Sequence, residues 1–188
     1  MSVKLKKVLL HICCGVCAGH AIEELQARGY LVSGYFYNPN IHPYKEYLLR
    51  KKEVKRIADF YKIKVISPNY QLDKWKKKCD KFKDEKEGGV RCDACFKLRL
   101  EESYKKAKNG NCDYFTTTLT ISPHKNSQKI FKIGKKIGKD KFLAIDFKKK
   151  NGFKKAIEIS KKLNLYRQNY CGCIYSLRDR ENKIEGRS

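Results

Sequence analysis

The stretch Val8-Leu9-Leu10-His11-Ile12-Cys13-Cys14-Gly15-Val16-Cys17 decides the fold. Its apolar first part predicts a buried strand, and the adjacent cysteines and the glycine mark a tight turn. Ala18, Ala21, Ile22 and Leu25 follow at the i, i+3, i+4, i+7 spacing of an amphipathic helix. In doubly wound α/β folds, ligands bind at this first turn, at the carboxyl end of a central strand. Thiols at the turn favour a soft metal over the phosphate that glycine-rich turns bind.

The rest of the chain alternates predicted strands and helices, which is typical of a parallel sheet with right-handed crossovers. Five strands are expected, at 4–12, 30–37, 63–67, 113–120 and 141–145. The predicted fold class is α/β: a single doubly wound, Rossmann-like domain over residues 1–188, with a charged, frayed tail after about residue 178. A strand order of 3-2-1-4-5 places the cysteine turn at the crevice between the first and fourth strands.

The chain is strongly basic, with a formal net charge of +24, which indicates a polyanionic partner such as nucleic acid. Lysines concentrate at 74–83 and 125–155. The alternative is a set of solvated, lysine-rich helix faces, as in heat-adapted proteins. No apolar run approaches the ~18 residues of a membrane-spanning helix, and the start lacks the features of a signal peptide. We therefore expect a cytoplasmic protein with no membrane partner.

Nine cysteines in a cytosolic chain indicate metal binding or thiol chemistry rather than disulfides. Cys92 and Cys95 are spaced i, i+3 at a predicted helix start, so both sulfurs share one face. The helix N-terminus and Arg91 favour the thiolate forms that metals need, although a redox dithiol is a rival use. Cys171 and Cys173 flank a glycine that lets the backbone wrap closely around a metal.

Together with Cys13 and Cys14, these two pairs supply six thiols, more than one tetrahedral zinc or simple cubane takes. The excess predicts two metal centres, or one cluster and a reactive dithiol. Successive extended side chains point apart, so Cys13 and Cys14 are predicted to serve different centres. Asp146, at the end of a predicted strand, is a candidate ligand of a mononuclear centre, and a helix-capping role is its alternative. Cys17 stays unassigned.

Four further polar residues follow strands at the same predicted edge of the sheet. Tyr37 and Asn38 end the second strand, and His124 and Lys125 follow the fourth. Because the carboxyl ends of parallel strands meet at one edge, these residues are candidates for binding substrate or donating protons.

Five motifs jointly resemble one family. They are His11–Cys17, Tyr37–Pro43, Arg91–Leu100, Thr116–Asn126 and Tyr166–Ser176. In this order, and over roughly residues 8–178, they are similar to the cobalamin-independent epoxyqueuosine reductases of the QueH family. Five joint motifs are far more specific than any one Cys-x-x-Cys pair.

The resemblance implies an oxidoreductase that reduces the epoxide of epoxyqueuosine in the anticodon loop of tRNA, with electrons from an external donor. It implies a [4Fe-4S] cluster, a second, mononuclear iron and a fold like the adenine-nucleotide hydrolases. The metal ligands at matching positions are Cys13, Cys14, Cys92, Cys95, Cys171 and Cys173. Loop bases are typically recognised by stacking, and the candidate platforms are Tyr35, Tyr37, Tyr44 and Tyr170.

Two other functions fit parts of the sequence. A tRNA-thiolating enzyme of related fold would need a Ser-Gly-Gly-x-Asp-Ser loop after the first strand, where this chain has Cys13–Cys17. A zinc-stabilised RNA-binding module without catalysis would use the same thiols. Iron in the anaerobically prepared protein distinguishes a cluster enzyme from the zinc module.

Overall fold

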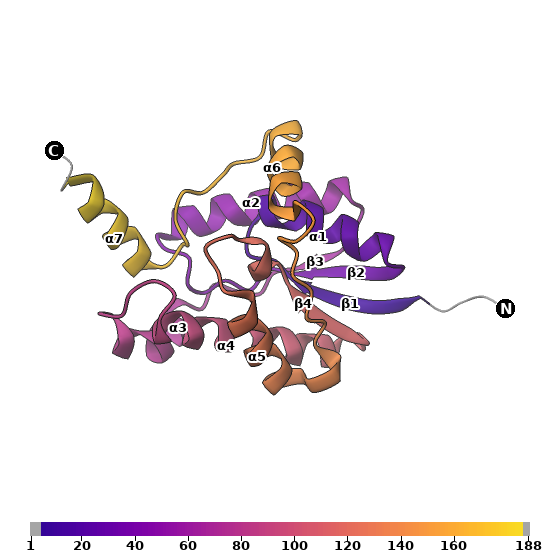
Figure 1. The fold of residues 1–188 in the computed structure, drawn as a ribbon, viewed down its shortest axis with the longest axis horizontal. Coiled ribbons are helices and arrows are strands. Elements are labelled where there is room, and N and C mark those ends of the chain that lie inside the picture. The colour runs from indigo at the N-terminus through magenta and orange to yellow at the C-terminus, as the bar shows by residue number, and fades with distance from the viewer. Residues whose placement is uncertain (1–4, 186–188) are drawn as a thin grey trace.

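The computed structural model describes residues 5–185 and contains the predicted parallel sheet (Figure 1). Its four strands are β1 (Lys6–His11), β2 (Tyr30–Tyr35), β3 (Val65–Ile66) and β4 (Tyr114–Thr117). All neighbouring pairs are parallel, and the order is β3-β2-β1-β4. The predicted α/β class and the position of the first strand between the second and the fourth are confirmed.

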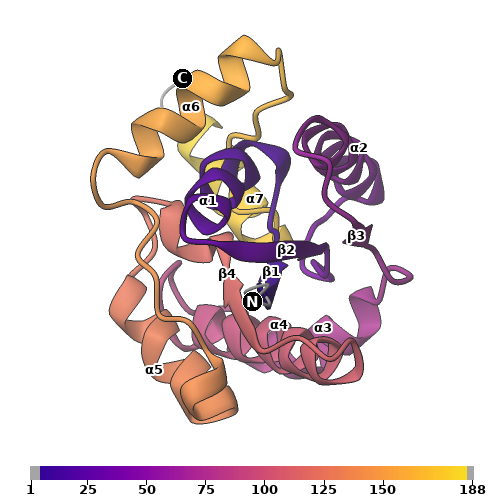
Figure 2. The same ribbon diagram turned by 90° about the vertical axis from the view of Figure 1, so that its right-hand side faces the viewer.

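Helices cover both faces of the sheet. The α-helices are α1 (Gly15–Ala27), α2 (Tyr44–Phe60), α3 (Leu72–Cys79), α4 (Val90–Asn109), α5 (Ser127–Gly138), α6 (Gly152–Lys162) and α7 (Ile174–Glu185). Three short 3-10 helices lie at Asp80–Phe82, Thr118–Ile121 and Lys139–Lys141. Figure 2 shows α1, α2 and α6 above the sheet and α3, α4 and α5 below it. No helix among residues 5–185 is both long and apolar enough to cross a membrane.

Strand β1 is buried from both sides, as an apolar run in a doubly wound fold requires. Val8, Leu10 and Ile12 pack into the core of one face, and Leu9 packs into the core of the other. His11, the last residue of β1, is paired in register with the last residues of β2 and β4, Tyr35 and Thr117. The turns that follow these three strands therefore lie at the same edge of the sheet. Cys13 and Cys14 are in the first of these turns.

The predicted fifth strand is not a regular strand. Phe142 forms a single parallel bridge with Phe115, and Leu143 N donates to Phe115 O at 2.9 Å. Ile145 N then bonds Leu143 O at 3.0 Å, so the backbone turns on itself and leaves the ladder. The segment lies beside β4, as the predicted order requires, but only for one bridge.

Residues 174–185 form helix α7, where the sequence predicts a frayed tail from about residue 178. Its first turn is tied to the segment before α4. Tyr175 Oη donates to Asp80 at 2.8 Å, and Ser176 Oγ donates to Glu87 at 3.1 Å. These two contacts anchor the helix next to Cys173.

Candidate metal centre

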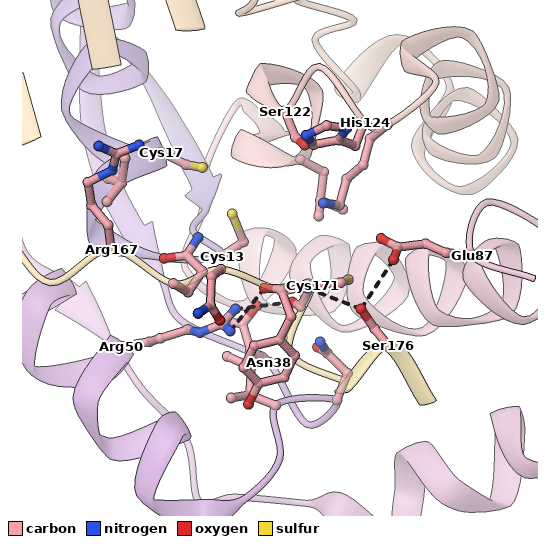
Figure 3. A pocket seen from close by; sticks show the side chains of 18 of the residues that line it. Cys13, Cys17, Asn38, Arg50, Glu87, Ser122, His124, Arg167, Cys171 and Ser176 are labelled. Carbon is pink, nitrogen blue, oxygen red and sulfur yellow. Dashed lines mark hydrogen bonds between the residues drawn. The ribbon is translucent and has the colours of Figure 1, made fainter. Parts of the chain in front are cut away.

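A cavity of about 710 Å³ opens at the carboxyl edge of the sheet. The turns after β1, β2 and β4 and the segment before α7 form its walls. Figure 3 shows Cys13, Cys17 and Cys171 around it, with Ser122 and His124 opposite. The cationic side chains that line it are Arg50, Arg99, Lys125, Arg167 and Arg180. The cavity therefore combines thiols with an excess of positive charge.

Cys13, Cys14 and Cys17 form what we call the three-thiol group. Their sulfur atoms all lie within 4.8 Å of one another, and those of Cys13 and Cys14 are 3.8 Å apart. Thr118 Oγ1 donates to Cys13 at 3.2 Å, and Gln168 Nε2 donates to Cys14 at 3.0 Å. The sulfurs are thus gathered and oriented by neighbouring donors.

The prediction that Cys13 and Cys14 point to different sites is wrong. Side chains alternate only along a straight strand, and the chain bends at Cys13, two residues after β1 ends. Cys14 is the N-cap of α1, with an extended φ of −167° and ψ of 165°. Cys17 stands three residues further on, in the first turn of α1, which brings its sulfur back to the same place.

Cys13 loses its proton more readily than Cys14 and Cys17 do. Hydrogen bonding to Cys14 and Cys17 lowers the pKa of Cys13 well below its ordinary value. The same interaction with Cys13 raises the pKa of Cys14 to about 12 and raises that of Cys17. One thiolate stabilised by two thiols is a donor set that a soft cation suits, because the cation replaces the remaining protons.

Cys92, Cys95, Cys171 and Cys173 lie near enough for their charges to interact, and we call them the four-thiol group. In contrast to the three-thiol group, no three of their sulfurs, all in the described part of the chain, lie within 4.8 Å of one another. Cys92 lies in the first turn of α4 and Cys95 in the second, both on its buried face, as predicted. Burial raises the pKa of Cys92 to about 11 and that of Cys173 to about 12, and the nearby Cys171 and Cys95 add to both. Gly88 N donates to Cys92 Sγ at 3.2 Å, and Ser176 N donates to Cys173 Sγ at 3.4 Å.

A buried cation beside this group has free donors. Arg91 is 1% exposed, and its Nε and Nη2 have no hydrogen-bond partner among the residues that the structure describes. Its charge lowers the pKa of Cys173 against the larger effect of burial. Three buried thiols and the half-buried Cys171, next to unpaired N–H donors, fit an anionic, sulfur-rich metal group, since such donors hydrogen-bond to its sulfurs.

Gly172, between Cys171 and Cys173, has a backbone conformation that brings the chain close to its neighbours. Its φ is +114°, a left-handed conformation that favours glycine. A Cβ there would lie 3.0 Å from Arg50 Nη1 and 3.1 Å from Ile41 Cγ1. The backbone at Gly172 therefore lies close to Arg50 and Ile41, and its close approach to a metal stays a prediction.

The predicted substrate residues lie in two different places, the cavity and the core. Asn38, His124 and Lys125 line the cavity, and Asn38 Nδ2 donates to Ile12 O at 2.8 Å. Burial lowers the pKa of Lys125, but the charges of Cys171, Cys13 and Cys17 outweigh it, and the net pKa is raised.

Tyr37 lies in the core instead. It is 2% exposed, its ring stacks on Tyr35 at 5.8 Å, and its hydroxyl donates to Gln71 at 3.1 Å. Neither tyrosine offers a free face for a base. Of the predicted platforms, Tyr170 lines the cavity and Tyr44 is exposed.

Asp146 is not among the residues that line the cavity. Its Oδ1 accepts from Ser127 Oγ at 3.0 Å and from Lys148 N at 3.4 Å. These contacts tie the start of α5 to the turn before α6. The N-caps of these helices are Asn126 and Asn151, so Asp146 does not have the helix-capping role that the sequence offered as the alternative.

Sequence reasoning missed Arg99, four residues after Cys95 on α4. Its guanidinium is 2% exposed and has no carboxylate within ion-pair distance among residues 5–185. Arg99 Nη2 donates to Asn38 Oδ1 and Nε to His11 Nε2. Burial and the charge of Arg99 lower the pKa of His11 to about 3, so the imidazole is neutral. A signal for Arg99 exists in the sequence, because the i+4 spacing from Cys95 predicts a shared helix face.

Known proteins resemble this chain over most of its length. The family model described as epoxyqueuosine reductase QueH matches residues 8–179. Among curated proteins named epoxyqueuosine reductase QueH, the one from Histophilus somni is 41% identical, over 92% of this chain and 73% of its own. That from Staphylococcus aureus is 40% identical, over 90% and 75%, and that from Thermotoga maritima is 35% identical, over 94% and 93%. The chain belongs to the QueH family of epoxyqueuosine reductases.

Proposed function

We propose that this chain reduces the epoxide of epoxyqueuosine to the alkene of queuosine at the wobble position of tRNA. The reaction takes up two electrons and two protons and releases the epoxide oxygen as water. Family membership supports the activity. The observation that carries it in this chain is the cavity that thiols of both groups line, Cys13 and Cys17 with Cys171.

The cofactors that suit the two thiol groups are a [4Fe-4S] cluster and a mononuclear iron. The four-thiol group offers the four thiolates that a cubane takes. The three-thiol group offers three thiolates, which leaves a fourth position open, as in catalytic metal sites. When bound, these centres supply single electrons and a Lewis acid for the epoxide oxygen, and an external donor supplies the electrons.

Several side chains that line the cavity are suited to binding the substrate. A volume of about 710 Å³ is within the range of small-molecule sites and accommodates one splayed-out base. Lys125 and Arg99 keep the cavity positive, which favours a phosphate and the oxygen that leaves the epoxide. Tyr170 offers a ring for stacking, and His124 and Asn38 offer polar contacts to the sugar or the base.

The test is conversion of tRNA that carries epoxyqueuosine. Anaerobically reconstituted, iron-loaded protein with a chemical reductant is expected to yield queuosine, detected by mass spectrometry of the nucleosides. The matched control is the same protein loaded with zinc, which binds thiolates but carries no electrons. Equal absence of conversion in both, with tRNA still bound, would favour the zinc-stabilised RNA-binding module.

The binding of tRNA is expected to weaken steeply with salt. The chain carries a net charge of +24, and each phosphate contact contributes about 0.7 to 0.9 to the slope of log affinity against log salt. Lys132 and Lys136 are exposed on α5 and make none of the ion pairs recorded in residues 5–185.

We expect Lys132→Gln/Lys136→Gln to flatten this slope, measured by fluorescence titration between low and physiological salt. Lys55→Gln, on α2 in the other helix layer, serves as the control. A slope near zero for the unaltered protein would mean that the basic surface does not bind the tRNA.

A further inference from the structure

The segment 163–173 carries Cys171 and Cys173 but forms neither helix nor strand. It runs from the end of α6 to the start of α7 and forms one wall of the cavity. Something other than backbone ladders must therefore set the position of these two thiols. The segment lies along one face of α2, which presents charged residues at positions 46, 50, 53 and 56. This i, i+4, i+7, i+10 spacing keeps all four on one side of the helix.

Near the C-terminal end of α2, side chains of this face bind the backbone at the beginning of the segment. Arg56 donates from Nη2 to Leu163 O at 2.8 Å and from Nη1 to Asn164 O at 3.1 Å. Glu53 Oε2 accepts from Arg56 at 2.8 Å and from Tyr166 N at 3.3 Å. Arg56 is 45% exposed, so these contacts are partly in water.

Closer to the N-terminal end of α2, side chains of this face bind the backbone beside the cysteines. Arg50 donates from Nη1 to Cys171 O at 3.0 Å and from Nη2 to Tyr170 O at 3.2 Å (Figure 3). Its Nε donates to Glu46 Oε1 at 2.7 Å, and Glu46 Oε2 accepts from Tyr166 Oη at 2.7 Å. Each of the three guanidinium nitrogens therefore donates to one fixed acceptor.

The guanidinium of Arg50 also packs against the segment. It lies 5.2 Å from the centroid of the Tyr170 ring, and Gly172 passes so close that no Cβ fits without displacement. On the other side, His42 N donates to Gly172 O at 2.7 Å. The backbone of residues 170–172 is thus held from two directions.

Stability alone explains this arrangement poorly. Arg50 is 3% and Glu46 7% exposed, and a buried ion pair adds little net stability compared with well-packed apolar residues. Such a pair contributes geometric precision, because the planar guanidinium fixes two carbonyls at once. Here those carbonyls are those of a proposed metal ligand and its neighbour.

We propose that Arg50, held by Glu46, is a positioning residue for the metal-binding segment: it fixes the carbonyls of Tyr170 and Cys171 so that the thiols of Cys171 and Cys173 face the metal. The inference rests on the proposed use of the four-thiol group as a metal site, and not on the identity of the substrate.

Removing Arg50 alone would leave Glu46 buried without a partner, and the variant would risk unfolding. The double variant Glu46→Gln/Arg50→Met avoids this, because it removes both charges and keeps an acceptor for Tyr166. Arg50→Lys keeps the charge but not the planar fork. The matched control is Arg56→Met, which removes contacts to the same segment at the end remote from the cysteines.

The first measurement uses metal-free protein and hydrogen exchange. In Glu46→Gln/Arg50→Met we expect the amides of residues 170–173 to exchange at least tenfold faster, with the sheet unchanged. In Arg56→Met the acceleration is expected to be confined to residues 163–166. Equal exchange at 170–173 in all variants would overturn the positioning role.

The second measurement uses Co²⁺ as the probe and reads its thiolate charge-transfer absorption, with Cys17→Ala added to every protein so that the three-thiol group binds the probe weakly. The double variant is expected to bind Co²⁺ at least tenfold more weakly and with an altered spectrum, Arg50→Lys to be intermediate, and Arg56→Met to match the unaltered protein. An unchanged spectrum and affinity in the double variant would refute the inference. If these Co²⁺ differences are found but the unaltered, iron-loaded protein does not convert tRNA, that result contradicts the proposed function alone.

Discussion

Cys92→Ser is expected to lose its cluster iron and, with it, all measurable conversion of epoxyqueuosine. Serine places a hydroxyl where soft iron needs a thiolate, and a hydroxyl is not deprotonated in that buried position. The affinity for the cluster should fall by well over about 100-fold, since loss of an outer-shell partner alone costs 10–100-fold. Cys95→Ser, Cys171→Ser and Cys173→Ser should behave alike, because the four thiols form one group.

Iron and acid-labile sulfide analysis after anaerobic reconstitution measures this loss, together with the visible absorption of the cluster. Cys112→Ser is the control. Cys112 follows α4 at the end away from the cavity, and its sulfur has only long contacts, 3.9 Å to Gly110 O and 4.0 Å to Ser33 Oγ. A Cys92→Ser protein with full iron, sulfide and turnover would contradict the assignment of the four-thiol group.

The sequence predicted the features that depend on local pattern. The apolar run ending at Ile12 predicted the central strand, and the spacing of Cys92 and Cys95 predicted their shared helix face. Alternation of strands and helices, with the handedness of crossovers, predicted the order β3-β2-β1-β4. These inferences succeed because each depends on backbone geometry over a few residues or on a general topological rule.

The failures depend on contacts that no local pattern encodes. Cys13 and Cys14 converge because the chain bends between β1 and α1, where Thr118 Oγ1 accepts from Cys13 N and donates to Cys13 Sγ. Tyr37 follows a strand, like Asn38, but its ring turns into the core beside Tyr35. Arg50 lies 121 residues from Cys171 in the chain, so only the tertiary fold brings them together.

Loss of a mononuclear iron, with the cluster retained, is the result expected for Cys17→Ala. The sequence argument gave that centre one thiol of the Cys13-Cys14 pair and Asp146. The structure instead gathers Cys13, Cys14 and Cys17 within 4.8 Å and ties Asp146 to Ser127. Two remaining thiolates bind a cation much more weakly than three, and Cys17 is not part of the four-thiol group.

Anaerobic analysis should therefore give five irons and four sulfides for the unaltered protein, and four and four for Cys17→Ala. Turnover should vanish in Cys17→Ala while the cluster absorption stays, because the open coordination position is lost and the electron carrier is not. Asp146→Ala should keep all five irons and lose only stability, by about 1 kcal/mol for its hydrogen bonds. If instead Asp146→Ala loses the fifth iron and Cys17→Ala keeps it, the carboxylate and not the third thiol completes this centre, and the loop before α6 must move when metal binds.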